Sequence, residues 1–169
     1  DPSYMVTNIG DFFDFISTAD VLIKNSSIGS ASTKALGFGG YDVTLLSSTM
    51  QADKVNGIVS NDLLLEGSGG GAASLKAVDE MHLAVGNEID LESFSNSAKI
   101  EVTAPTGKLY FHFPLRGYEG WDVDGVASAL TSTVSPNTGI FVNGAPAIKD
   151  ENFFVTYGGV NFPLRDILR

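Results

Sequence analysis

The chain has 169 residues, of which 20 are acidic, 10 are basic and none is cysteine, so its formal net charge is −10. This length fits one domain with a sizeable core, and we treat residues 1–169 as a single β-rich domain. The negative charge argues against nucleic-acid binding, because lysine and arginine supply most of the affinity for phosphates. The lack of cysteine excludes disulfide scaffolds, zinc–thiolate sites and cysteine nucleophiles.

The composition also indicates an environment. Charged residues make up 18% of the chain, and glycine occurs 19 times among many serines, threonines and asparagines. An acidic composition that is low in charge and rich in small polar residues favours an extracellular, cell-surface or virion location. No apolar run approaches the roughly 18 residues of a membrane-spanning helix, so we expect no membrane insertion.

The first predicted element is a helix over residues 5–17. Val6, Ile9, Phe13 and Ile16 recur there at intervals of three and four residues, as on one face of an amphipathic helix. We expect this helix to pack across the end of a β core.

Two Asn-Gly pairs predict β-hairpins. Asn56-Gly57 lies between Val55 and Ile58, and Asn143-Gly144 follows the apolar residues 140–142. Asparagine and glycine tolerate the positive φ angles of a type I′ turn, so each pair should connect two antiparallel strands.

Between these pairs, residues 67–71 are almost all glycine and predict a mobile surface loop. Residues 75–85 fit either a helical face or an alternating strand, and we favour a strand for their second half. Gly86-Asn87 should then turn the chain into residues 88–92, where acidic and apolar residues alternate as in a half-exposed strand.

The stretch of residues 99–125 holds the clearest predicted hairpin and the one tryptophan. Residues 99–102 and 109–113 alternate, with Leu109, Phe111 and Phe113 facing inward, and 104–107 read Ala-Pro-Thr-Gly, as in a type I turn. A short helix should follow at residues 126–130, capped by an aspartate.

Two short fragments occur twice in the chain. Phe-Pro-Leu-Arg is found at 113–116 and 162–165, and Gly-aromatic-Asp-Val at 40–43 and 120–123. The two offsets differ, so no single period fits both. We interpret the fragments as recurring strand-end chemistry and not as a duplicated unit.

Together these patterns give about eight to ten short strands and one or two short helices. We therefore predict an all-β, mainly antiparallel fold: a β-sandwich, a jelly roll or a closed barrel. The strands do not alternate with helices, which disfavours a parallel sheet.

The loop after residue 116 is the best candidate site. Tyr118 and Trp121 could stack on a sugar ring, although for Trp121 we favour a role as an anchor of the loop on the core. Asp122 and Asp124 place oxygen ligands at alternate positions before a glycine, as in the first half of a calcium loop, or they cap a helix. The later ligands of an EF-hand loop are missing, so we expect no cofactor and keep calcium as the one alternative.

Catalytic groups are sparse. His82 and His112 are the two histidines, and Gly-x-Ser-x-Gly is absent, so a serine triad has little support. A glycoside hydrolase needs two carboxylates that face each other across a cleft, which neighbours in sequence do not supply. We expect most such pairs to lie on a solvated surface. The pairs are Asp79-Glu80, Asp90 with Glu92, Asp122 with Asp124, and Asp150-Glu151.

We therefore expect a protein without enzymatic activity: a structural or adhesive subunit of an extracellular or viral assembly, with protein partners and self-association. The first alternative is a binding module that holds a carbohydrate through Tyr118 and Trp121, or an apolar small molecule inside a β-barrel. A hydrolase that uses paired carboxylates is the least supported hypothesis.

Overall fold

The structure is a computed structural model that describes residues 12–112 without a gap, together with the strand segments 5–6, 139–142, 145–146, 153–157 and 160–163. Within these residues every regular element is a β-strand, which confirms the all-β prediction. The described residues contain no helix that could cross a membrane.

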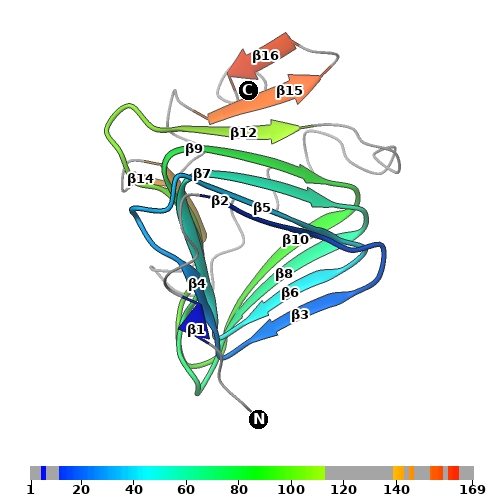
Figure 1. Cartoon of the computed structure of the whole chain (residues 1–169). Coiled ribbons are helices and arrows are strands. Elements are labelled where there is room, and N and C mark those ends of the chain that lie inside the picture. Colours follow the sequence, from blue (N-terminus) through cyan, green and yellow to red (C-terminus); the bar gives the residue numbers. More distant parts are fainter. Residues whose placement is uncertain are drawn as a thin grey trace.

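The strands wind into a β-solenoid in which successive coils stack on one another (Figure 1). Each coil that is described in full contributes one strand, or one half of a long strand, to each of three walls. Wall 1 consists of β3 (Val21–Lys24), β6 (Val43–Leu46), β8 (Asp62–Gly67) and β10 (Glu88–Ser93). Wall 2 consists of β1 (Met5–Val6), β4 (Ser27–Gly29), the first halves of β7 (Thr49–Val59) and β9 (Ala73–Val85), β11 (Ala98–Val102) and β13 (Gly139–Val142). Wall 3 consists of β2 (Phe12–Ile16), β5 (Ala35–Gly40), the second halves of β7 and β9, β12 (Lys108–His112) and β15 (Phe153–Tyr157).

Within each wall the strands pair in parallel, so the predicted antiparallel sandwich, jelly roll or closed barrel is wrong. Only β14 (Ala145–Pro146) and β16 (Val160–Pro163) pair antiparallel among the described strands, with β13 and β15 respectively. A parallel pair needs a long crossover connection. Here the other two walls of the same coil supply it, so no helix is required.

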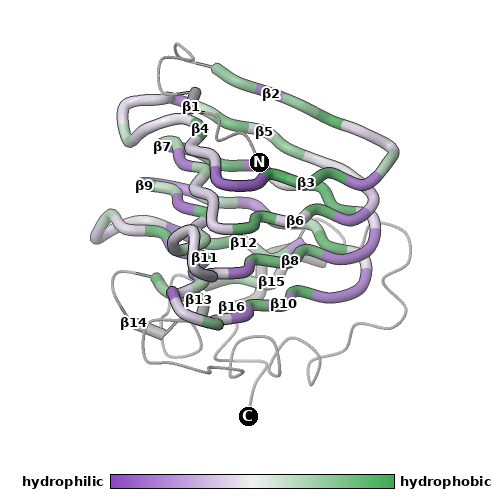
Figure 2. Tube along the Cα trace, turned by 90° about the horizontal axis from the view of Figure 1, so that it is seen from below, coloured by the Kyte–Doolittle hydropathy of each residue, from purple (hydrophilic) through white to green (hydrophobic). Residues whose placement is uncertain are grey.

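The core consists of apolar residues stacked in register from coil to coil. Figure 2 shows the strands of wall 1 stacked in the order β3, β6, β8 and β10. Residues that are paired in register through successive strands form a ladder, and each wall has at least one ladder that faces the core. In wall 1 this ladder is Val21, Val43, Leu63 and Ile89. In wall 2 it is Ile28, Met50, Leu75, Ile100 and Ile140, and in wall 3 it is Phe13, Leu36, Val55, Met81 and Leu109.

These coils are a structural repeat without a fixed sequence period. Along one ladder, Val21 pairs with Val43, Val43 with Leu63, and Leu63 with Ile89, which are steps of 22, 20 and 26 residues. The number of residues per coil varies because the corners between the walls differ in length. Only the pattern of buried residues therefore repeats from coil to coil. Of the two echoed fragments, residues 113–116 and 120–123 lie outside the described part of the chain.

The predicted helix over residues 5–17 is wrong, because β1 and β2 are strands. Phe13 and Phe15 pack against the core, whereas Phe12 and Ile16 are 72% and 71% exposed. Exposed and partly buried residues thus alternate with the period of two of a β-strand. The strand forms in place of the predicted helix because β2 pairs along its whole length with β5. The predicted helix at residues 126–130 lies outside the described residues.

The two Asn-Gly predictions have opposite outcomes. Asn56-Gly57 lies inside β7, and neither residue has a positive φ, so the first hairpin is wrong. The second is confirmed, because β13 and β14 pair antiparallel on either side of residues 143–144.

The predicted hairpin of residues 99–113 is wrong in its pairing and right in its turn. The Gly107 N–H donates to the Ala104 carbonyl at 2.8 Å, which closes the expected turn. The strands on either side, β11 and β12, both pair in parallel with β9 and belong to different walls. Leu109 and Phe111 are buried as predicted, whereas Phe113 is outside the described residues.

The remaining strand predictions are confirmed in part. The ambiguous residues 75–85 are strand throughout, and the half-exposed strand at residues 88–92 is β10. The glycine-rich residues 67–71 form a tight turn, in which the Ser68 and Gly71 backbones exchange hydrogen bonds of 3.0 and 3.1 Å.

Candidate functional site

A groove of about 450 Å³ runs along the outer surface of wall 3. Its floor is the outward side of β5, where Ala35 and Gly37 are too small to fill the space between neighbouring strands. Phe12 and Lys54 stand in register on either side of Ala35. The groove therefore follows directly from two small residues in a row of larger ones.

Polar side chains surround this floor. Asp14 and Asn56 lie in register on either side of Gly37, and Glu80 and His82 follow from the next strand, β9. Four adjacent strands thus line the groove, which spans about 14 Å at the usual strand spacing.

The absence of a side chain at Gly37 leaves room for the carboxylate of Asp14. A Cβ atom at residue 37 would collide with the Asp14 carboxylate, which leans over the groove floor. Phe12, at the open edge of the same groove, exposes 72% of its surface. An exposed aromatic ring therefore lies close to a carboxylate in this concave site.

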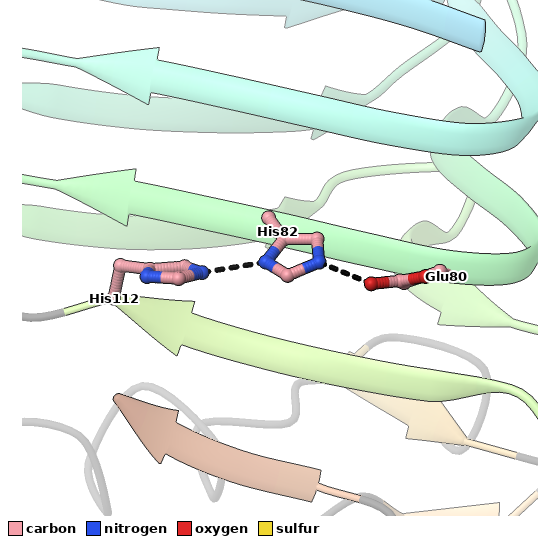
Figure 3. Close-up of polar contacts among 3 residues, drawn as sticks. All are labelled: Glu80, His82 and His112. Carbon is pink, nitrogen blue, oxygen red and sulfur yellow. Dashed lines mark hydrogen bonds and ion pairs between the residues drawn. The ribbon is translucent and has the colours of Figure 1, made fainter. Parts of the chain in front are cut away.

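Glu80, His82 and His112 form a hydrogen-bonded chain beside the groove (Figure 3). The distance from His82 Nε2 to Glu80 Oε1 is 2.5 Å, and the distance from His82 Nδ1 to His112 Nε2 is 2.6 Å. A carboxylate can only accept, so His82 carries its proton on Nε2. When His82 is neutral, its Nδ1 is therefore the acceptor, and His112 Nε2 donates to it.

A stack of aromatic rings holds His82 in place. His82 lies parallel to Tyr110, with ring centroids 4.5 Å apart and an interplanar angle of 8°. Tyr110 in turn stacks on Phe154 at 5.2 Å. The parallel register of β9, β12 and β15 brings the three rings together, because Tyr110 pairs with both His82 and Phe154.

The environment of His112 favours its neutral form. Burial lowers the pKa of His112 below its ordinary value of 6.5, and the charge of the neighbouring His82 lowers it further. A neutral imidazole can both donate and accept hydrogen bonds, or offer a lone pair to a metal ion.

The sequence pointed to a different place for the site. Tyr118, Trp121, Asp122 and Asp124 all lie outside the described residues, so their arrangement is untested. Among the described residues no group of three or more His, Asp or Glu side chains could hold a metal ion.

Of the predicted carboxylate pairs, Asp90 and Glu92 do interact, on the outer surface of wall 1. The hydrogen bond with Asp90 raises the pKa of Glu92 above its ordinary value of 4.5, as do burial and the negative charges of Asp90 and Glu66. Glu80 belongs to the groove and bonds to a histidine instead.

Sequence reasoning missed the groove, although a signal was present. Glu80 and His82 alternate along one strand, and Tyr110 and His112 alternate along another, so all four point outward from their strands. The alternation of residues does not reveal the register of β9 and β12, which places Tyr110 beside His82.

Comparisons of the chain with protein-family models, with curated proteins and with solved structures find no match.

Proposed function

We propose that the chain is a non-enzymatic saccharide-binding solenoid, an adhesive subunit of an extracellular or virion-surface assembly that binds its ligand in the groove of wall 3. The observation that carries this proposal is the combination in one groove of an exposed aromatic ring, Phe12, with the polar groups of Asp14, Asn56 and Glu80.

The chemistry of a sugar fits this lining. A sugar ring has an apolar face of C–H groups, which suits the face of an aromatic side chain. Its hydroxyl groups both donate and accept, which suits the carboxylates of Asp14 and Glu80 and the amide of Asn56. The groove volume of about 450 Å³ lies within the usual range of ligand sites.

The β-sheet supplies rigidity. The groove residues stand on one continuous sheet, in which β5 and β7 pair on both sides and β2 pairs with β5, so the backbone that carries them is held in place before any ligand binds. Such preorganisation lowers the entropic cost of binding. The alternative of an apolar ligand inside a barrel loses its basis, because the solenoid is not a barrel and large side chains such as Phe38 and Phe111 fill its interior.

The experiment is a glycan-array screen of the purified chain, followed by calorimetry with the best ligand. Phe12→Ala should weaken binding at least about tenfold, since an aromatic contact and its buried area are lost. Phe94→Ala is the matched control, because Phe94 is 71% exposed but does not line the groove. Equal affinities of the two variants would refute the groove as the site.

The loop hypothesis is tested with the same ligand. If Tyr118 and Trp121 form the platform, then replacing both with alanine abolishes binding while Phe12→Ala leaves it intact. The adhesive-subunit part of the proposal predicts self-association, and a strict monomer in light scattering at high concentration would argue against it.

A further inference from the structure

We propose that His82 and His112 form a binding site for a divalent transition-metal ion that prefers nitrogen ligands, with zinc as the representative ion. This inference goes beyond the saccharide proposal and does not depend on it. It rests on the direct approach of two imidazole nitrogens from neighbouring strands.

The nitrogens His82 Nδ1 and His112 Nε2 face each other at 2.6 Å. Zinc–nitrogen bonds are about 2.0–2.1 Å long, so two nitrogens on one zinc ion are about 3.0–3.4 Å apart. The rings therefore need to separate by less than about 1 Å to admit the ion between them. Imidazole nitrogens suit zinc, copper and nickel, whereas calcium and magnesium prefer oxygen.

Glu80 has the position that metal sites give to an outer carboxylate. It accepts a hydrogen bond from His82 Nε2, which directs the lone pair of Nδ1 toward His112. A histidine that binds a metal typically donates its other N–H to such a partner. The stack on Tyr110 fixes the plane of the same ring.

The proton balance is simple. His112 gives up the hydrogen bond to His82 Nδ1, and its proton moves from Nε2 to Nδ1 through solvent. Both imidazoles remain neutral, so the protein neither gains nor loses a proton. The His82 side chain is 32% exposed and lines the groove, so the ion can enter from solvent, and water completes its coordination.

The test is calorimetric titration of the tag-free, chelator-treated chain with zinc ions at neutral pH. The chain has two histidines, so no other imidazole competes. His82→Ala and His112→Ala should each weaken zinc binding at least about tenfold, and Glu80→Gln by about tenfold or more. Lys108→Ala is the control, because Lys108 is exposed and pairs in register with Glu80 without being a ligand.

Nitrogen NMR of the two imidazoles gives a second readout. Zinc should shift His82 Nδ1 and His112 Nε2 and move the His112 proton to Nδ1. Circular dichroism checks that each variant is folded, and His82→Gln replaces His82→Ala if the alanine variant unfolds. Zinc affinity that is unchanged in both single variants would overturn the proposal, as would zinc shifts confined to other residues.

The outcome of the zinc titration is independent of the outcome of the saccharide screen. The glycan screen is carried out in chelator, so saccharide binding without zinc binding, or the reverse, identifies which of the two proposals is wrong.

Discussion

The ring of Phe38 occupies the space that a side chain on Gly57 would need. The two residues are paired in register on β5 and β7, and both face the core. A Cβ atom at residue 57 would lie 2.7 Å from Phe38 Cε1 and 2.9 Å from Leu83 Cδ2. Gly57 is therefore a packing residue, which makes room for the phenylalanine ring on the neighbouring strand.

Gly57→Ala should destabilise the fold by about 1–3 kcal/mol, the usual cost of overpacking a core. Urea unfolding measures this change. Gly69→Ala is the control, because a Cβ atom there meets nothing within 4 Å, and it should change stability by less than about 0.5 kcal/mol. Equal effects of the two substitutions would contradict the packing role.

Phe38→Leu should partly rescue Gly57→Ala. Leucine removes the ring atoms that approach residue 57, so the double variant should lose less stability than the two single losses added together. A double-mutant cycle measures this coupling, and strict additivity would show that the two positions do not interact.

Ser48→Ala should destabilise the corner between walls 1 and 2 by about 1–3 kcal/mol, because buried polar groups lose their partner. The Ser48 hydroxyl accepts from the Ser26 N–H at 3.0 Å and lies 2.8 Å from the Leu46 carbonyl, to which it donates. Ser48 is 1% exposed. Ser32→Ala removes an exposed hydroxyl and should have little effect in the same unfolding measurement.

Glu92→Gln should stabilise the fold at neutral pH, with a gain that shrinks as the pH falls. The hydrogen bond with Asp90, burial and the nearby carboxylates raise the pKa of Glu92 above 4.5, so the folded state favours its protonated form. That contribution is fully present below the unfolded value of 4.5 and is lost as the pH rises through the folded pKa.

The free energy of unfolding of the wild type and of Glu92→Gln, measured from acidic to neutral pH, checks this prediction. In an Asp90→Asn background the effect of Glu92→Gln should be smaller, because the main partner of Glu92 has lost its charge. A gap between wild type and variant that does not change with pH would count against it.

Gly37→Ala should preserve the fold and weaken saccharide binding. The methyl group collides with the Asp14 carboxylate, which is exposed and can rotate away, so the stability change should stay within about 0.5 kcal/mol. Asp14→Ala should weaken binding to the same extent, and combining the two should add nothing. A Gly37→Ala variant with full affinity would exclude Asp14 from the site.

The sequence by itself determined the local features of this protein. Alternation of apolar and polar residues identified the strand at residues 88–92 and the burial of Leu109 and Phe111. Turn chemistry identified the corner at residues 104–107 and the antiparallel pairing around residues 143–144. These features depend on neighbours in sequence, which a short window contains.

Only the tertiary structure decided how the strands pair. A period of two specifies which face of a strand is buried, but it is the same for parallel and antiparallel partners. The role of Gly57 depends on Phe38, which belongs to the preceding coil, and His82 meets His112 only through the register of β9 and β12. Because the coils differ in length, a search of the sequence for a fixed period does not find that register. The groove and its histidine pair can therefore be identified only from the stacked coils of the structure.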